Sequence, residues 1–246
     1  MITEQMALYA GIGFAAGLMS GFFGIGGGSI RIPLLNVYGM PLLNAFAVNM
    51  LVIPFAQSVG AYTHRKNIDK NIALYAVIGG VIGSVAGAIF TGFVPALVLS
   101  LIFVAVALLT IVGVYLDRIF PKLYQRLTPS WNNIVLGTFV LNLITGMRGG
   151  SGGSLFPPFL KAMHLDIHKA IATSLFITIF TATAAIMIYW KRGNIPWIAT
   201  LSVLIGSMIG ARIGGKISLK TKPFWLQIGL SILVVGLALL MVYKSL

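Results

Sequence analysis

The sequence predicts an all-α polytopic membrane protein made of two homologous halves, and three observations support this prediction. Of the 246 residues, 58% are hydrophobic and only 9% are charged, and the mean hydropathy of +0.99 lies above the range of soluble globular proteins. Apolar stretches long enough to cross about 30 Å of hydrocarbon recur along the whole chain. A glycine-rich motif near the N-terminus returns at mid-chain, which indicates an internal duplication.

The apolar stretches predict the membrane-spanning helices. They cover residues 8–23, 45–62, 72–92, 94–116, 131–147, 170–190, 195–213 and 224–243. The N-terminus carries Glu4 and no basic cluster before the first stretch, so we expect that stretch to remain as a helix and not to be cleaved as a signal peptide.

The repeated motif relates the two halves of the chain. GFFGIGGGSIRIPLL at residues 21–35 and GMRGGSGGSLFPPFL at residues 146–160 share the pattern G-x-x-G-x-x-G-G-S-x-x-x-P-x-L, at a shift of 125 residues. Beyond the motif, the alignment pairs Asn49 with Ser174, and it pairs Gly79, Gly83 and Gly87 with Gly206, Gly210 and Gly214. We therefore predict an N-terminal half at residues 1–120, a linker at 121–130 and a C-terminal half at 131–246, which together form one membrane domain.

The basic residues predict how often each half crosses the membrane. Eight spans would divide these residues almost evenly between the two sides and would set no orientation. A further short crossing after each motif, at residues 29–38 and 154–163, places eleven basic residues on one side (Arg65, Lys66, Lys70, Arg118, Lys122, Arg126, Lys161, Lys169, Lys216, Lys220 and Lys222) and three on the other (Lys191, Arg192 and Lys244).

The uneven division obeys the positive-inside rule. It predicts five crossings per half, an inverted repeat, both termini outside and a cytoplasmic linker. Each added crossing contains about ten residues, or about 15 Å of helix, so it has to be a broken or re-entrant helix.

The broken helices predict an anion site. Irregular backbone at membrane depth is tolerated where it lines a polar cavity, and the first amides of a restarted helix carry partial positive charge. Ser29 and Ser154 are the expected N-caps of the two restarted helices. The predicted substrate-binding residues are Gly26, Gly27, Gly28, Ser29, Arg31 and Asn49 in the first half, and Arg148, Gly149, Ser151, Gly152, Gly153, Ser154 and Ser174 in the second. Paired broken helices of this kind are typical of secondary transporters.

Charge inside the membrane favours the same substrate class. The four acidic residues, Glu4, Asp69, Asp117 and Asp166, fall in predicted loops or tails, whereas two arginines lie inside the motifs. The arginines are not repeat equivalents, because Arg31 aligns with Phe156 and Arg148 aligns with Phe23. We expect a positive, asymmetric cavity that binds a small anion. Which of Arg31 and Arg148 contacts the anion stays open.

Several residues have a structural interpretation beside the functional one. Asn49 and Ser174 either contact substrate or satisfy backbone groups freed by the breaks. The motif glycines could serve close helix packing alone, and packing is the favoured role of the four-spaced glycines at 79–87 and 206–214.

Composition and motif context argue against other function classes. The chain has no cysteine, which removes disulfides and thiolate chemistry. The net charge of +13 lies in short loops between apolar spans, which favours an anionic membrane surface over nucleic acid as its partner. GGSGG at 149–153 formally matches a serine nucleophile motif, but His64, His164 and His168 all fall in predicted loops, and the first half has Gly26 in place of Ser151. We expect no enzyme activity, no cofactor and no metal.

At these residues the chain resembles the TauE/SafE family, the sulfite exporters. Its members carry a motif close to GxxGxGGGxxxxPxL, here residues 21–35, and a degenerate second copy, here residues 146–160. The resemblance implies export or uptake of small sulfur-containing anions such as sulfite, a sulfonate or sulfoacetate, by secondary transport in a prokaryotic inner membrane, and we expect an exporter. The alternatives are a passive anion channel, uptake of another oxyanion such as thiosulfate, and a scaffold that transports nothing. The exact substrate, the direction of transport, the coupling ion and the formation of a homo-oligomer stay open.

Overall fold

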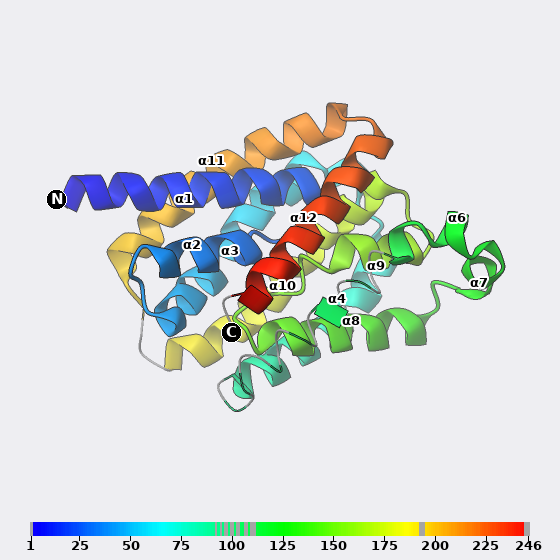
Figure 1. Ribbon diagram of the computed structural model, residues 1–246, viewed down its shortest axis with the longest axis horizontal. Coiled ribbons are helices and arrows are strands. Elements are labelled where there is room, and N and C mark those ends of the chain that lie inside the picture. Colours follow the sequence, from blue (N-terminus) through cyan, green and yellow to red (C-terminus); the bar gives the residue numbers. More distant parts are fainter. Residues whose placement is uncertain are drawn as a thin grey trace.

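The computed structural model describes residues 2–91, 112–191 and 195–243, together with scattered positions between 92 and 111, and every regular element among them is helical. The elements are α1 (Ile2–Phe23), α2 (Gly28–Val37), α3 (Leu42–Thr63), η1 (Arg65–Asn67), α4 (Lys70–Ile89), α6 (Leu116–Ile119), α7 (Pro121–Arg126), α8 (Trp131–Gly146), α9 (Phe156–Ala162), α10 (Ile167–Lys191), α11 (Trp197–Lys220) and α12 (Pro223–Tyr243). Figure 1 shows them as one bundle.

The predicted spans correspond to these helices. Among the described residues, five helices are long and apolar enough to cross a membrane: α1, α3, α4, α10 and α11. The predicted span at 94–116 lies mostly outside the described residues. The two predicted short crossings are present as α2, with 10 residues, and α9, with 7 residues. The protein is therefore an all-α, multi-pass membrane protein.

Helices on either side of each short helix run in the same direction. Ser20 of α1 bonds to Gln57 of α3, and Ile12, about two turns earlier in α1, packs in one cluster with Val48 of α3. In the second half, α8 and α10 both run parallel to α4, because Gly79 and Gly83 of α4 lie against Val135 and Phe139 of α8, and Gly80 and Ser84 lie against Ile177 and Thr181 of α10. Two parallel neighbours can be joined only by a segment that returns along them. α2 and α9 are these return segments.

The centre of the bundle is formed by α3 and α10, which run antiparallel. Near one end the rings of Phe46 and Tyr189 lie 6.5 Å apart. Near the other end Leu175 packs against Gly60, where an added Cβ would lie 3.3 Å from its side chain. Both helices are rich in buried residues, so they carry the core on which the short helices pack.

Two further helix pairs bring the halves together through glycine. A Cβ on Gly17 of α1 would lie 2.2 Å from the backbone oxygen of Ser207 in α11, and one on Gly210 would lie 2.2 Å from the oxygen of Phe14. In the other pair, a Cβ on Gly83 of α4 would lie 2.2 Å from the oxygen of Phe139 in α8. The backbones of each pair are in direct contact, which only glycine allows. The packing role predicted for the four-spaced glycines is confirmed.

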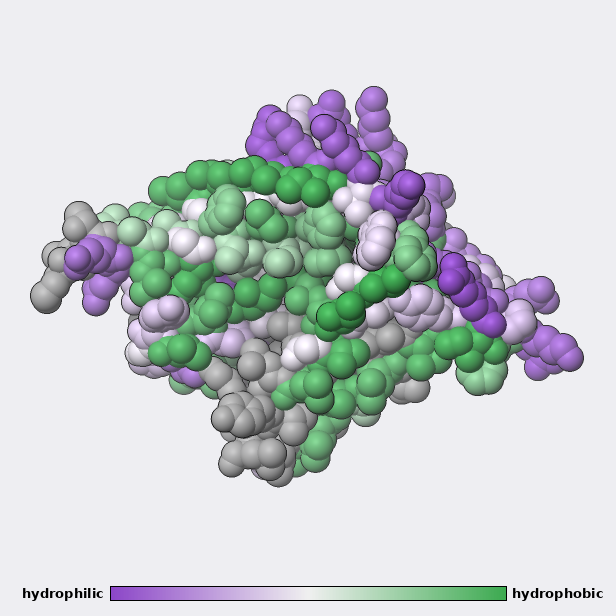
Figure 2. All heavy atoms as spheres, turned by 45° about the horizontal axis from the view of Figure 1, so that its top comes forward, coloured by the Kyte–Doolittle hydropathy of each residue, from purple (hydrophilic) through white to green (hydrophobic). Residues whose placement is uncertain are grey.

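The outer face of α11 is apolar, as expected of a helix in lipid. Ile205, Ile209 and Ile213 are 60%, 52% and 40% exposed, on positions next to the glycines that face α1. Figure 2 shows hydrophobic residues over much of this face of the molecule and hydrophilic ones gathered toward one end. Charged loops at the basic end, which we define by η1, α6, α7 and the C-terminus of α11, account for this distribution.

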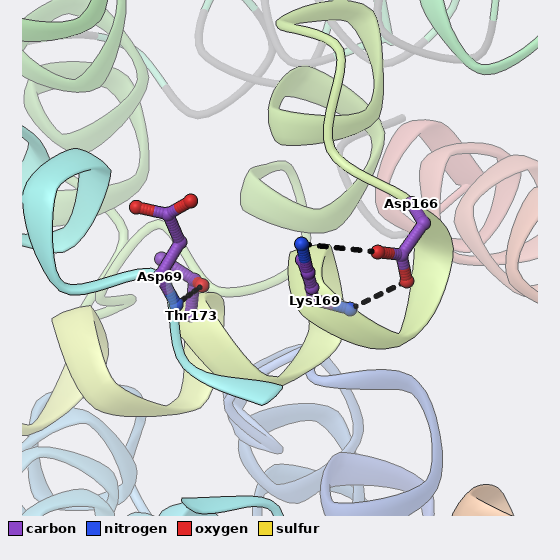
Figure 3. A network of polar contacts seen from close by, with 4 residues as sticks. All are labelled: Asp69, Asp166, Lys169 and Thr173. Carbon is purple, nitrogen blue, oxygen red and sulfur yellow. Dashed lines mark hydrogen bonds and ion pairs between the residues drawn. The ribbon is translucent and has the colours of Figure 1, made fainter. Parts of the chain in front are cut away.

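Acidic residues at the basic end serve as helix caps. Asp69 accepts a hydrogen bond from the backbone amide of Ile72 in the first turn of α4, and its own amide donates to Thr173 at 3.1 Å. Asp166 accepts from the amide of Lys169 in the first turn of α10 and lies 4.0 Å from the Lys169 ammonium (Figure 3). These carboxylates stabilise helix N-termini at the surface, away from the arginine in the core.

Candidate functional site

The two glycine motifs meet in the interior, backbone against backbone. A Cβ on Gly153 would lie 2.7 Å from the carbonyl carbon of Ile25, and one on Gly26 would lie 3.3 Å from the Ser151 hydroxyl. Gly24, Gly27, Gly149 and Gly152 all adopt positive φ, between 68° and 75°, which costs a side-chain-bearing residue energy. In the repeat alignment Gly24 pairs with Gly149 and Gly27 with Gly152. Glycine is required at these positions both by conformation and by close approach.

Arg31, the fourth residue of α2, is the fully buried charged residue of this region. Its side chain is completely buried. Nη1 donates to Asn49 Oδ1 at 2.6 Å and Nη2 donates to Ser207 Oγ at 3.0 Å, while Nε has no hydrogen-bond partner in the part of the chain that the structure describes. Both partners are neutral. A buried guanidinium held only by neutral groups is an uncompensated charge, which is costly unless an anion joins it.

Asn49 and Ser174 each bond to the glycine run of the opposite half. Asn49 Nδ2 donates to the carbonyl oxygen of Gly149 at 2.8 Å, and Ser174 Oγ donates to the carbonyl oxygen of Gly24 at 2.6 Å. The two donors, Asn49 and Ser174, are repeat equivalents, and so are the two acceptors, Gly149 and Gly24. The two bonds therefore correspond to each other under the repeat. Of the two roles that the sequence left open, these bonds represent the satisfaction of freed backbone groups. Asn49 adds a second contact, to Arg31.

The expected serine N-caps are wrong. α2 begins at Gly28 after Gly27, whose φ of 74° makes it a left-handed cap, so Ser29 already lies inside the helix. α9 has Leu155 as its N-cap and begins at Phe156, which is two residues beyond Ser154. The cause in α9 is local: Pro157 and Pro158 occupy the first turn, where a missing amide hydrogen is tolerated. Ser154 is buried in the turn before α9. The residues of the second motif that correspond to the start of α2 therefore form a turn and not the first turn of a helix.

The remaining predicted residues divide between buried and partly exposed positions. Ser151, Gly152 and Gly153 are buried, and the Ser151 carbonyl accepts from Thr181 of α10 at 3.2 Å. Arg148 is only partly buried, in the turn that follows α8, where its amide donates to the Thr145 carbonyl. The two arginines therefore lie in different environments, with Arg31 in the core and Arg148 nearer the surface.

The neighbourhood of Arg31 and its repeat equivalent differ in chemistry. Arg31 lies against Gly27, where an added Cβ would be 3.1 Å from Nη2. The equivalent of Arg31 is Phe156, whose ring lies against Gly152 in the same manner, at 2.7 Å. One half therefore presents a cation and the other a phenyl ring at matching positions. The two motifs are therefore asymmetric at this pair of residues.

Sequence reasoning missed several polar side chains around the site. Ser207 of α11 accepts from Arg31 and donates to the carbonyl of Gly13 at 3.0 Å. Ser20 and Gln57 bond to each other next to Gly27. Asn142 of α8 is buried beside Gly152, and its Oδ1 has no hydrogen-bond partner. A signal existed in each case, since each is a polar residue inside an apolar span.

The paired carbonyl bonds lead to a first prediction. Ser174→Ala leaves the buried Gly24 carbonyl without its donor, which costs about 1–3 kcal/mol of unfolding free energy. We expect a lower midpoint in detergent thermal unfolding, with membrane insertion retained. Ser174→Thr keeps a hydroxyl and is the matched control. An unchanged midpoint in Ser174→Ala would show that the bond contributes nothing.

The chain matches a known family over nearly its whole length. The sequence profile described as sulfite exporter TauE/SafE matches residues 9–241. The chain belongs to the TauE/SafE family. The match includes both glycine motifs and every helix from α2 to α11, so the resemblance inferred from residues 21–35 and 146–160 is confirmed. Members of the TauE/SafE family are membrane transport proteins and not enzymes, which places this chain among transporters.

Curated relatives agree with the TauE/SafE assignment at the level of transport. Probable membrane transporter protein YdhB of Bacillus subtilis is 25% identical over 82% of this chain and 86% of its own length. YjnA of the same organism is 25% identical over 93% of this chain and 97% of its own. Probable membrane transporter protein MJ0441 of Methanocaldococcus jannaschii is also 25% identical, over 94% of this chain and 93% of its own. No solved structure matches the chain.

Proposed function

We propose that the protein is a secondary transporter, acting as an exporter, of a small sulfur-containing anion such as sulfite, a sulfonate or sulfoacetate. The observation that carries this proposal is Arg31, which is completely buried and whose hydrogen-bond partners among the described residues are the neutral Asn49 and Ser207. A tetrahedral or pyramidal oxyanion fits this environment, since it accepts several hydrogen bonds and neutralises the guanidinium. The family assignment supports sulfur oxyanions as the class.

The proposed anion lies where the two glycine runs meet. Arg31 supplies the charge, and the amides that open α2 at Gly28 and Ser29 supply donors with partial positive charge. From the other half, the turn at Gly152–Ser154 supplies backbone and hydroxyl groups. Arg148, nearer the surface, attracts the anion toward the site through longer-range electrostatics.

We also propose that the two halves, at residues 1–120 and 131–246, are arranged as an inverted repeat. Such an arrangement allows alternating access. It is supported by the parallel pairs α1 with α3 and α8 with α10, and by close contacts of α1 with α11 and α4 with α8 that exchange under the repeat alignment. We place the basic end, including the linker, in the cytoplasm of a prokaryotic cell whose inner membrane holds the protein, with both termini outside. Rocking of one half against the other would open the site to each side in turn.

Transport in proteoliposomes tests the proposal. We expect efflux of sulfite from loaded vesicles to saturate with concentration, to be competed by a sulfonate and to leave sodium and chloride gradients unchanged. Vesicles that contain the Arg31→Gln protein are the matched control. Unitary currents in planar bilayers would instead identify a channel, and absence of flux for sulfite, sulfonates, sulfoacetate and thiosulfate alike would contradict transport of this class.

A further inference from the structure

His64 is a buried histidine for which the anion site provides no role. It follows the last residue of α3 and is 1% exposed. Nε2 lies 3.2 Å from the carbonyl oxygen of Gly21, the first glycine of the first motif. Because a carbonyl only accepts, Nε2 carries the hydrogen and Nδ1 carries a lone pair. That lone pair is buried and has no hydrogen-bond partner among the residues that the structure describes.

The second half contains the same contact, built from a different side chain. The repeat shift pairs His64 with Tyr189 and Gly21 with Gly146. Tyr189 donates to the carbonyl of Gly146 at 3.3 Å and is 3.1 Å from the hydroxyl of Thr91. Each contact joins the end of a central helix to the first glycine of a motif. The histidine contact lies at the basic end and the tyrosine contact lies at the opposite end.

A third position completes the correspondence. The alignment that pairs Gly87 with Gly214 also pairs Thr91 with Ser218. Ser218 is buried, and within the described ranges its hydroxyl has no hydrogen-bond partner. It lies one turn beyond Gly215, where an added Cβ would be 3.3 Å from His64 Nε2. The tyrosine contact is thus completed by a hydroxyl partner, whereas the histidine contact leaves two polar atoms, His64 Nδ1 and Ser218 Oγ, unused.

We propose that His64 is a proton-binding site of the transporter, and that proton uptake at Nδ1 loosens the contact between α3 and the first glycine motif at the basic end. The inference rests on the proposed transport function and deepens it by naming the proton as the coupled ion. The Nδ1 lone pair accepts a proton from hydronium, which leaves as water; no bond of the ring breaks, and the product is an imidazolium in a buried site. The tyrosine contact lacks a group that titrates near neutral pH. Only the histidine contact, at the basic end, therefore responds to pH in this range.

The charged groups around His64 do not stabilise an imidazolium. From α10, His168 faces it and repels positive charge. From α11, Gly215 faces it and is uncharged. Ser218, one turn further along α11, is buried and neutral, while Arg212 and Lys216 on that helix are exposed. From α1, the neutral Gly21 carbonyl faces it. Arg65 and Lys66, next in the chain, are exposed, and the Arg65 guanidinium lies over the Tyr62 ring.

This environment sets the direction of the pH effect. Burial lowers the pKa of His64 from 6.5 to about 4; the hydrogen bond to Gly21 opposes this shift and His168 adds to it. Since the pKa of the buried ring is lower than that of a ring in water, protonation favours conformations in which the ring reaches water. The contact between His64 and Gly21 is fully stable above about pH 6.5 and weakens as the pH falls toward 4. Each pH unit in this range raises the fraction of molecules in which the contact is broken by at most about tenfold.

A single-cysteine accessibility experiment tests the site without substrate. The native chain has no cysteine, so Ser218→Cys introduces a unique thiol beside the contact. Its rate of alkylation by a membrane-impermeant maleimide is measured from pH 5 to 8 in inside-out vesicles. Division by the rate for Gln125→Cys, an exposed position on α7, removes the pH dependence of the thiol itself. We expect the ratio to rise severalfold between pH 7 and pH 5.

Variants at His64 decide the outcome. His64→Tyr installs the side chain of the other half, and His64→Gln removes the titratable group; with either, the ratio should stay flat, whereas His168→Gln should leave the rise in place. A rise that persists in His64→Tyr and His64→Gln, or no rise with His64 present, would overturn the proposal.

Transport provides a second measurement that needs no cysteine. In proteoliposomes, sulfite flux with His64 should accelerate as the pH at the basic end falls from 7 to 5.5, and the His64→Gln protein should lose this dependence. Equal pH profiles would also overturn the proposal. An accessibility change with His64 but no flux of any anion would support the proton site and reject the transport function, so the two failures are distinguishable.

Discussion

Arg31→Gln should lower the affinity for sulfite by about 30-fold to more than 1,000-fold, because it removes the one completely buried cation among the described residues. Truncation of a charged hydrogen-bonding partner in a desolvated site costs about 2–5 kcal/mol of binding free energy. Isothermal titration calorimetry of purified protein in detergent measures this loss. Affinity equal to that of the unmodified protein would remove Arg31 from the site.

Companion variants separate the charge from the fold and from the second arginine. Arg31→Lys keeps the positive charge but loses the planar fork, so we expect an intermediate affinity. Arg148→Gln, at a partly exposed position, should cost less than Arg31→Gln, and Arg212→Gln, at an exposed position of α11, should cost nothing. Removing a buried charge that has no acidic partner does not weaken the fold greatly, so Arg31→Gln should elute as the unmodified protein does in size-exclusion chromatography.

Gly17→Ala should strongly destabilise the protein. The added Cβ would lie 2.2 Å from the backbone oxygen of Ser207 and 2.7 Å from its Cα, and a backbone cannot rotate away as a side chain can. α1 and α11 would have to separate, which disrupts a contact repeated at Gly13 and Gly21. Overpacking costs typically about 1–3 kcal/mol and more against rigid neighbours. We expect a large fall in the thermal unfolding midpoint, together with a lower yield of folded protein.

The same helix provides the control. Gly11 has nothing within 4 Å of an added Cβ, so Gly11→Ala should leave the midpoint unchanged or raise it through the helix propensity of alanine. Equal midpoints for Gly17→Ala and Gly11→Ala would show that the close backbone contact is not essential to stability.

The sequence predicts most of the architecture because its signals are local or periodic. Apolar length predicted α3, α4 and α10. Self-comparison found the motif at residues 21–35 and 146–160, and the division of the basic residues predicted a short crossing after each copy. The exact starts of these crossings could not be predicted, because the left-handed Gly27 and the prolines of α9 compete with serine capping.

The contacts inside the site depend on the packing of the two halves. The bonds from Asn49 to Gly149 and from Ser174 to Gly24 join residues 100 and 150 positions apart, and a motif in one half contains no information about its acceptor in the other. Ser207 was missed for the same reason, since only the packing of α11 on α1 brings its hydroxyl to Arg31. Domain boundaries and the binding roles of the predicted residues stay predictions.

The pairing of α1 with α11 has a consequence for biogenesis. Ser207 and Gly13 bond across 194 positions of sequence, so the ribosome completes most of the chain before α1 can find its partner. Until then the glycine face of α1 is in contact with lipid or with the insertion machinery. Neither half should therefore reach its native packing when it is synthesised alone, and the first helix to enter the membrane should be among the last to settle.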